Sequence, residues 1–319
     1  MNKNAEIITI LCSHLCLADD IKPLEPSQWH ALEERLRTCK LQIADLADFA
    51  EQDFEAKLGY SPEEAARLMR LLDRSGSLCF ELARYEDMGI NIITCADESY
   101  PKQLKRKLEK KYPPMFYSVG DPALLESEAV GYVGSRDVSQ DDIDFTKKTV
   151  ATTAALGYAV VSGGARGIDS VAATAAMAEG VPAIEFLSDS LLRKMRNATL
   201  MREIRDGHVL LMSVAVPTAG FNVGIAMMRN HYIYAQSVAT VVVRSDLNKG
   251  GTWSGAKDNL KQKYCPLFCR DCDYPGNKAL IEMSAIPIDE NWDGDISAKT
   301  QEETSEAQQI SMFDLGLSN

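Results

Sequence analysis

The stretch VVSGGARGID (Val160–Asp169) decides the fold, because it joins a buried strand to a helix through a glycine-rich loop. Its valines end an apolar run that is typical of a strand buried on both faces of a sheet. The segment GIDSVAATAAMAEG (167–180) then follows the pattern of a helix. Glycine lets a backbone approach a ligand closely, and a helix start offers unpaired N–H groups to an anion. The loop is therefore a candidate anion site, with Arg166 as its cation.

The same strand–loop–helix unit recurs between residues 128 and 290. The strand-like segments, separated by helical ones, are AVGYVG, YAVVSGG, VPAIEFL, HVLLMSV, ATVVVRS and CPLFCR. This alternation predicts βαβ units, and hence an α/β fold with a parallel sheet and helices on both faces. Three glycines fit the left-handed position after a helix, and they are Gly157, Gly180 and Gly207.

The flanking segments differ in composition from this region. Residues 1–88 have helical periodicity, and SPEEAARLMRLL begins with Ser61 as an N-cap and Glu64 at the capping-box spacing. We therefore predict a small N-terminal helical domain at 1–88 and the α/β domain at 89–290. Residues 291–319 are acidic and lack a sustained apolar pattern, which predicts a flexible tail.

Composition limits the class of protein. The length suits roughly two domains. The net charge of −12 argues against extensive wrapping of nucleic acid, although a cleft with its own positive field can still bind it. No apolar run reaches the roughly 20 residues of a membrane span, and we find no signal peptide, so we expect a cytoplasmic protein without membrane association. The spacing of Cys265, Cys269 and Cys272 differs from a zinc site and favours buried thiols.

Three strand-to-helix loops share one design of glycines, a hydroxyl and a cation. Loop 1 is GSR (134–136), loop 2 is SGGARGID (162–169) and loop 3 is KGGTWS (249–254). In a parallel sheet such loops lie at the carboxyl edge, where ligands bind. Together they predict a site for phosphate or nucleic acid. Tight turns with solvent-facing cations are the alternative interpretation.

The sequence shows no familiar catalytic pattern. Loop 2 is not G-x-G-x-x-G, Glu185 falls inside a strand rather than at a ribose-binding position, and no G-x-x-x-x-G-K-[ST] occurs. No Ser-His-Asp arrangement or carboxylate pair stands out, so we predict no enzyme, no cofactor and no metal. Asp169 is expected to pin its helix start, with Arg166 as a candidate partner.

The segment MMRNHYIYAQS adds a further candidate. Arg229 and His231 stand beside Tyr232 and Tyr234, a combination that suits a nucleic-acid strand whose bases stack on aromatic rings. The alternating tyrosines fit core positions equally well, and both interpretations stay open. The basic run KQLKRKLEKK (102–111) is typical of a solvated helix face, with the rim of a binding cleft as the alternative.

In order and spacing, GYVGSR, VVSGGARGID, RNHYIYAQS and NKGGTWSGA resemble the DNA-processing protein A family, also called DprA or Smf. The segments ELARYEDMGINIITCADESYPKQL and PPMFYSVGD resemble the approach to that family's Rossmann-like domain, so the resemblance covers roughly residues 80–288. It implies an extended Rossmann-like fold that binds single-stranded DNA. It also implies help in loading a RecA-type recombinase during natural transformation, a homo-oligomer that is often a dimer, and no enzymatic activity.

Matching residues carry the family's site onto this chain. They are Gly134, Ser135 and Arg136 for the G-S-R loop, Ser162, Gly163, Arg166, Gly167 and Asp169 for the S-G-x-A-R-G-I-D loop, and Arg229 and Asn230 for the R-N-[RK] motif. Gly164 and His231, which stand beside these residues, are further members of the predicted site. Loop 3 completes the predicted site with Lys249, Gly250, Gly251 and Thr252. The chain departs from the family at Ala173, where a histidine is usual, at His231, and in the approach FNVGIAMM. These departures indicate a divergent member.

The tail adds a candidate partner site. Gln309-Ile310-Ser311-Met312-Phe313 resembles the short motif by which bacterial proteins bind the replicative sliding clamp. An extended peptide with a glutamine and an apolar pair suits capture in a pocket, with Gln309, Met312 and Phe313 as the binding residues. A tail segment that folds back on the chain is the alternative.

We therefore predict a single-stranded-DNA-binding protein of DNA processing and recombination, with weak sequence preference. Its pathway stays open among recombinase loading, DNA uptake and phage defence. The alternative is a nucleotide-binding sensor or a nucleotide-processing enzyme, with its ligand on the same loops.

Overall fold

The computed structural model describes residues 2–297, and these divide into two compact units. Of the described residues, one unit consists of 2–125 and Leu187–Ile225, and the other of Glu126–Phe186 and 226–297. The domain boundaries predicted from the sequence stay a prediction. Most of the predicted acidic tail lies outside the described residues.

The second unit contains six parallel strands. Along the sheet their order is β5-β4-β3-β7-β8-β9, and each neighbouring pair is parallel. The chain winds outward from β3 in one direction and from β7 in the other, so a topological switch point lies between these two strands. The predicted parallel α/β sheet is confirmed. The strands are β3 (Ala129–Val133), β4 (Ala159–Ser162), β5 (Ala183–Leu187), β7 (Ala239–Val242), β8 (Leu267–Arg270) and β9 (Ile286–Ile288).

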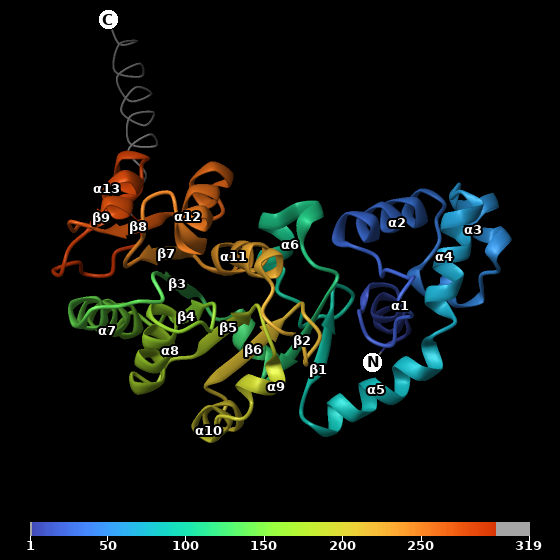
Figure 1. The fold of residues 1–319 in the computed structure, drawn as a ribbon, viewed down its shortest axis with the longest axis horizontal. Helices are drawn as coiled ribbons and strands as arrows, with labels where there is room; N and C mark the ends of the chain where they lie inside the picture. Colours follow the sequence, from blue (N-terminus) through green and yellow to red (C-terminus); the bar gives the residue numbers. More distant parts are fainter. Residues whose placement is uncertain (1, 298–319) are drawn as a thin grey trace, which may run out of the picture. The chain divides into compact units, whose positions relative to one another are not determined.

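Helices cover both faces of these strands. In Figure 1, α7 and α8 lie together on one side of the sheet, and α12 and α13 lie on the other. Right-handed crossovers that wind in opposite directions from a switch point place their helices in this way. The three helix-ending glycines named above all have positive φ, as predicted. The helices are α7 (Gln140–Ala155), α8 (Ile168–Ala178), α11 (Val223–Gln236), α12 (Gly250–Gln262) and α13 (Pro275–Glu282).

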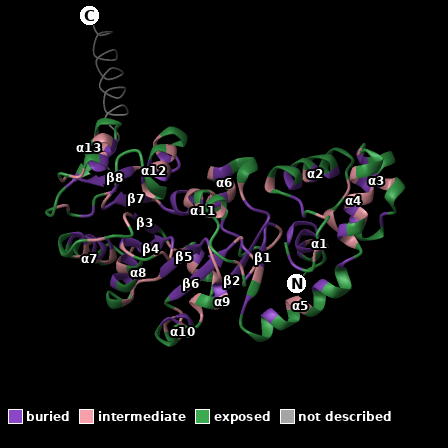
Figure 2. Cartoon of the chain, in the orientation of Figure 1, coloured by how far each residue is buried: buried purple, intermediate pink, exposed green. Residues whose placement is uncertain are grey.

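The strands of the second unit are apolar because they are buried on both faces. Every residue of β3, β4, β5, β7 and β8 is buried, and Figure 2 shows the contrast with the exposed outer faces of the helices. Valine and isoleucine suit this position, since branched side chains pack well on a pleated surface. Large buried side chains complete the core, and they include Tyr132, Phe186, Tyr232, Tyr234 and Phe268.

The first unit combines helices with three antiparallel strands. The strand β2 lies between β1 and β6 and pairs antiparallel with both. HVLLMSV, expected as one more strand of a parallel sheet, forms β6, and its partner in this unit is antiparallel β2. The strands are β1 (Asn91–Thr94), β2 (Met115–Val119) and β6 (Val209–Ser213). The helices are α1 (Lys3–Cys12), α2 (Pro26–Thr38), η1 (Ile43–Asp48), α3 (Glu51–Leu58), α4 (Pro62–Leu72), α5 (Ser75–Asp87), α6 (Lys102–Leu108), η2 (Glu109–Lys111), η3 (Pro122–Glu126), α9 (Leu191–Lys194) and α10 (Ala198–Arg205).

For the first unit, the predicted N-cap at Ser61 is confirmed. The Ser61 hydroxyl caps α4 by accepting a hydrogen bond from the Glu64 N–H at 3.3 Å. The basic run forms α6 and η2, which bury Leu104 and Leu108. Lys110 pairs at the surface with Glu34 at 2.7 Å. The run is therefore a helical segment with exposed basic residues, and its role as the rim of a binding cleft stays the alternative prediction.

The cysteines of the second unit follow the sequence prediction. Cys265 and Cys269 are buried, and Cys272 is half-buried. Burial raises the pKa of the Cys269 and Cys272 thiols, which keeps them protonated. Within residues 2–297, no helix combines the length and apolarity needed to cross a membrane.

Candidate functional site

The three glycine loops flank the topological switch point of the second unit. Loop 1 follows β3, loop 2 follows β4 and loop 3 follows β7, and these three strands are neighbours in the sheet. Because the strands are parallel, their carboxyl ends share one edge. The three loops therefore lie side by side at this edge.

Loops 1 and 2 touch through their backbones. The Ile168 N–H, at the start of α8, donates to the Ser135 carbonyl at 3.2 Å. Gly167 has a φ of +82° and ψ of −134°, and a Cβ there would overlap the Ser135 carbonyl and lie 2.7 Å from Arg136 Cα. A Cβ on Gly134 would lie 2.9 Å from Ile168 Cβ. These glycines are required because the two loops meet without room for side chains.

Loop 3 is bonded to loop 1. The Thr252 hydroxyl donates to the Gly134 carbonyl at 2.9 Å. The Ser135 N–H donates to the Arg244 carbonyl at 3.0 Å, in the chain that leads from β7 to loop 3. The three loops therefore form one hydrogen-bonded surface.

The helix α11 brings Arg229 and Asn230 to two different loops. The Arg229 side chain is only 7% exposed, and its Nη1 lies 3.8 Å from Oδ2 of Asp169 in loop 2. The Asn230 Nδ2 donates to the Gly251 carbonyl of loop 3 at 3.1 Å. His231 Nε2 lies 2.5 Å from Asp258 Oδ2 on α12. The R-N-H segment thus lies among the predicted loops.

Asp169 is buried under loop 2 and pins it. The Ala165 N–H donates to Asp169 Oδ2 at 3.4 Å, and the Gly163 N–H donates to the same carboxylate. Burial raises the pKa of Asp169, and the Arg229 guanidinium opposes that shift. Asp169 was expected to pin the start of its helix, but the N–H groups that it binds belong to loop 2, because its carboxylate turns back under the loop.

The candidate pairing of Asp169 with Arg166 is wrong. Arg166 pairs instead with Asp137 at 3.3 Å, and their side chains are 75% and 86% exposed. The reason is geometric, because Arg166 lies on the outer side of loop 2 while Asp169 is buried beneath it. Arg166 is therefore accessible to a ligand, since an exposed ion pair contributes little stability and exchanges easily.

The predicted site residues separate by exposure. Among the predicted site residues that the structure describes, the exposed ones are three cations and two glycines. They are Arg136, Arg166, Lys249, Gly250 and Gly251. The half-buried members are Gly134, Ser135, Gly164, Gly167, Asn230, His231 and Thr252. The buried members are Ser162, Gly163, Asp169 and Arg229. Gln309, Met312 and Phe313 lie outside the described residues.

Tyr232 and Tyr234 belong to the core. Both side chains are buried, and burial raises the pKa of their hydroxyls. The Tyr232 ring packs edge-on against Phe186, with centroids 5.9 Å apart. The interpretation as core positions is confirmed, and stacking of bases on these two rings is wrong.

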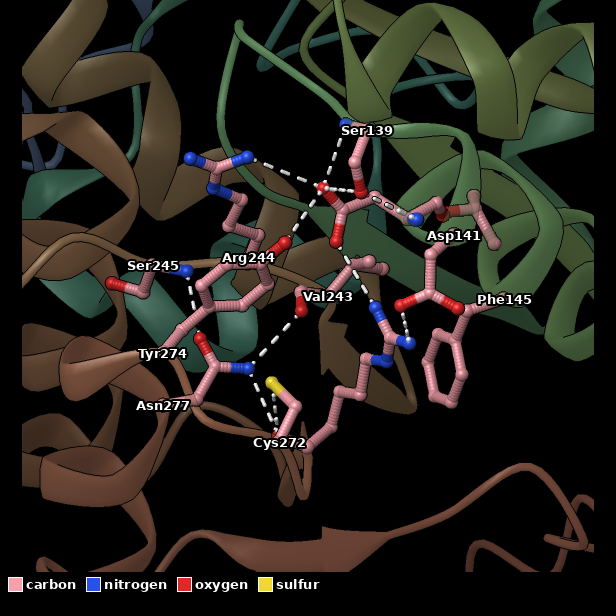
Figure 3. A network of polar contacts seen from close by, with 12 residues as sticks. Ser139, Asp141, Phe145, Val243, Arg244, Ser245, Cys272, Tyr274 and Asn277 are labelled. Carbon is pink, nitrogen blue, oxygen red and sulfur yellow. Dashed lines mark hydrogen bonds and ion pairs between the residues drawn. The ribbon is translucent and has the colours of Figure 1, made fainter.

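A network of polar contacts around Asp142 meets the chain where loop 1 leads into α7 (Figure 3), and the sequence analysis did not identify it. The buried Asp142 carboxylate accepts from Arg270 at 3.0 Å, from Arg244 at 3.3 Å and from the Tyr274 hydroxyl at 3.2 Å. It also accepts from Ser139, the N-cap of α7. Since α7 follows loop 1 directly, the network fixes the exit of that loop. The S-x-x-D capping spacing was the only local signal.

Asn277 ties α13 to the ends of two strands in the same network (Figure 3). Its Oδ1 accepts from the Ser245 N–H at 2.8 Å. Its Nδ2 donates to the Val243 carbonyl at 3.0 Å and to the Arg270 carbonyl at 2.9 Å. These bonds fix the chain that enters loop 3.

Comparison with known proteins gives one family match and one curated relative. The model of the family described as DNA recombination-mediator protein A matches residues 91–294. Protein Smf of Escherichia coli (strain K12) is 29% identical over 199 residues, which are 60% of this chain and 51% of that protein. The chain thus spans about half the length of the curated relative that it matches.

Two solved structures are similar over much of the chain. DNA processing protein A from Streptococcus pneumoniae has a TM-score of 0.69 at 19% identity, and covers 89% of this chain and 94% of its own. That likeness shows the fold. DNA processing protein A from Helicobacter pylori, a structure that concerns its single-stranded DNA binding mode, has a TM-score of 0.52 at 26% identity. It covers 62% of this chain and 90% of its own.

Replacing Asp142 with asparagine should destabilise the fold and weaken its acid sensitivity. Burial alone would raise the pKa of Asp142, but hydrogen bonds from Ser139, Tyr274 and Arg244 hold it below its ordinary value. The ionised carboxylate therefore stabilises the fold at neutral pH, and this stabilisation is lost as pH falls through the lowered folded pKa. We expect Asp142→Asn to lower the free energy of unfolding by about 3–5 kcal/mol at pH 7, as removal of one partner of a buried ion pair does.

Urea denaturation at several pH values measures this effect. The matched control is Asp144→Asn, an exposed carboxylate on the same helix, which should stay within about 0.5 kcal/mol of wild type. The gap between Asp142→Asn and wild type should narrow as pH falls. A gap that is independent of pH, or equal losses for the two variants, contradicts the assignment.

Replacing Gly167 with alanine should disrupt the contact between loops 1 and 2. The backbone conformation of Gly167, with φ of +82° and ψ of −134°, costs about 1–3 kcal/mol for a residue with a side chain. At Gly167 the added Cβ also meets backbone atoms of loop 1, which cannot turn aside. Gly180→Ala is the control, because Gly180 has a φ of +71° and open space around its Cβ position. Urea denaturation should show a larger loss for Gly167→Ala, and equal losses contradict the loop contact.

Proposed function

The chain belongs to the DNA recombination-mediator protein A family, whose model matches residues 91–294, and from this premise we propose that it binds single-stranded DNA in DNA processing and recombination. The observation that carries the proposal is the single bonded surface formed by loops 1, 2 and 3, with Arg136, Arg166 and Lys249 exposed on it. The similarity to the Helicobacter pylori protein, whose structure concerns single-stranded DNA binding, supports it.

The proposed ligand groups are the phosphates of the strand. The helices α8 and α12 begin in loops 2 and 3, so their first N–H groups and positive dipole ends face the carboxyl edge of the sheet. Arg166 and Lys249 add a cation to each loop, and Arg136 adds a third on loop 1. This set matches the repeated charge of a nucleic-acid backbone, whereas a neutral metabolite would use little of it.

Phosphate contacts position a strand without reading its bases. The aromatic side chains of α11 and loop 3 beside the site, Tyr232, Tyr234 and Trp253, are buried and offer no stacking surface. We therefore propose weak sequence preference.

The proposal assigns binding rather than catalysis, without a cofactor. It places the protein in the cytoplasm as a homo-oligomer that acts with a RecA-type recombinase. Such binding could act in any of three pathways, which are DNA uptake, recombinase loading and phage defence.

The second candidate is a nucleotide-binding sensor or a nucleotide-processing enzyme with its ligand at the same loops. The observation that favours it is the strand order of the second unit, because doubly wound sheets bind nucleotides at their switch point. The two candidates differ in the length of the ligand that binds tightly.

A titration that compares an oligothymidylate with thymidine monophosphate and ATP separates these candidates. We expect tight binding of the oligonucleotide only, and a steep loss of affinity between roughly 50 and 200 mM salt, because bound phosphates release counterions. Fluorescence anisotropy measures both quantities. Binding of a mononucleotide alone, or its hydrolysis, supports the second candidate and contradicts the first.

Variants of Arg166 and its partner test the surface within the same titration. Arg166→Ala should weaken binding and reduce the salt slope by about 0.7, the value for one phosphate of a single strand. Asp137→Asn should strengthen binding, because it removes the carboxylate that competes for Arg166. Lys148→Ala, an exposed cation on α7, is the control that leaves the slope unchanged. An Arg166→Ala protein that binds like wild type removes Arg166 from the site.

The segment Gln309–Phe313 lies outside the described residues, and we propose that it binds the replicative sliding clamp. Phe313→Ala should abolish capture of purified clamp by the immobilised protein, because the apolar pair would no longer fill a pocket. Ser318→Ala, outside the motif, should leave capture unchanged. Equal capture by wild type and Phe313→Ala refutes the assignment.

A further inference from the structure

We infer that Arg229 and Asn230 form a clamp on α11 that positions loops 2 and 3 for the DNA strand, and that Arg229 does not itself bind phosphate. The inference rests on the proposed function, because it assigns roles within the same site. It changes the role of Arg229 from a phosphate ligand to a positioning residue.

Burial separates Arg229 from the other cations of the site. Its side chain is 7% exposed, whereas that of Arg166 is 75% exposed. The Arg229 Nη1 lies 3.8 Å from the Asp169 carboxylate, whose side chain is also buried. A guanidinium held in this way already has an anionic partner, and its low exposure leaves little of it for a phosphate in solution to reach.

Gly163 shows that Arg229 occupies a place built for it. A Cβ at position 163 would overlap the Arg229 guanidinium and lie 2.6 Å from its Nη2. Gly163 is not among the glycines with positive φ, so its backbone conformation does not require glycine. Glycine is required at position 163 because the Arg229 guanidinium fills the space that a side chain would occupy. Arg229 therefore packs directly on the backbone of loop 2.

The contacts continue from Arg229 to the exposed part of loop 2. Arg229 pairs with Asp169, and Asp169 accepts hydrogen bonds from the Gly163 and Ala165 N–H groups. Arg166 is the next residue along the chain. The buried ion pair thus fixes the backbone on both sides of Gly164 and sets where Arg166 is presented.

Asn230 makes the corresponding contact with loop 3. Its Nδ2 donates to the Gly251 carbonyl at 3.1 Å, two residues after Lys249. A Cβ on Gly255 would lie 3.3 Å from Asn230 Cβ, so α11 and α12 also approach closely at this point. Adjacent residues on a helix point in different directions, and here they reach two different loops. One helical dipeptide therefore sets the spacing between the cations of loops 2 and 3.

Three variants separate a clamp from a phosphate contact, in the oligothymidylate titration with full-length protein. Arg229→Lys keeps the charge but loses the planar fork that packs on Gly163 and pairs with Asp169. Gly163→Ala changes no charge and displaces the guanidinium. The double variant Arg229→Met with Asp169→Asn removes both partners of the buried pair, which avoids leaving one of them alone in the core.

We expect all three variants to bind about tenfold more weakly or worse, a loss that corresponds to roughly 1.4 kcal/mol. We expect each to keep the salt slope of wild type, because the number of phosphates contacted does not change. Gly163→Ala and Arg229→Lys should also fail to add in a double-mutant cycle, since each disrupts the same contact. Thermal melting shows whether each variant is folded. If a variant of Arg229 does not fold, the affinity and salt slope of Gly163→Ala decide between a clamp and a phosphate contact.

Two results overturn the clamp. One is a salt slope that falls by about a further 0.7 when Arg229→Met with Asp169→Asn is added to Arg166→Ala, which indicates a phosphate contact made by Arg229 itself. The other is wild-type affinity in Arg229→Lys, since lysine binds phosphate as a point charge without a fork. Absence of salt-dependent binding by the wild-type protein defeats the proposed function itself, and is distinct from either result.

Discussion

The backbone contact between loops 1 and 2 is the constraint on which the rest of the site depends. At Gly167 the chain passes so close to the Ser135 carbonyl that no side chain fits, and the first N–H of α8 bonds to that carbonyl. This contact joins the carboxyl ends of β3 and β4 beside the switch point. Loop 3 is joined to loop 1 by a hydrogen bond from the Thr252 hydroxyl to the Gly134 carbonyl. Because hydrogen bonds join the three loops, their exposed cations lie on one continuous surface.

Two buried ionic groups hold that surface at different loops. Beneath loop 2, Asp169 pairs with Arg229 and collects N–H groups of the loop backbone. Where loop 1 leads into α7, Asp142 accepts from Arg244 and Arg270 and fixes the start of that helix (Figure 3). Breaking such a pair by removing one partner is costly, whereas exposed pairs such as Arg166–Asp137 exchange readily. Rigid, buried pairs therefore support loops whose exposed cations are available to a ligand.

The sequence predicted the position of the three loops better than the buried contacts that hold them. Strand–loop–helix spacing was sufficient to place loop 2 and its neighbours on one sheet edge, because parallel strands leave no other arrangement. The burial of Arg229 was not predictable, since a basic residue beside tyrosines suits a surface and a core equally well. Its partner Asp169 is sixty residues away in sequence. The contact of Asp142 with Arg270 spans 128 residues, and only the tertiary structure brings the two side chains together.

Hydrogen exchange of the backbone, measured with and without an oligothymidylate, tests most directly that the three loops act as one surface. Exchange reports local opening of each amide, so a bound strand should slow exchange where it orders the backbone. We predict that loops 1, 2 and 3 gain protection together at the same DNA concentration. Protection confined to one loop, or found only in the first unit, contradicts the account.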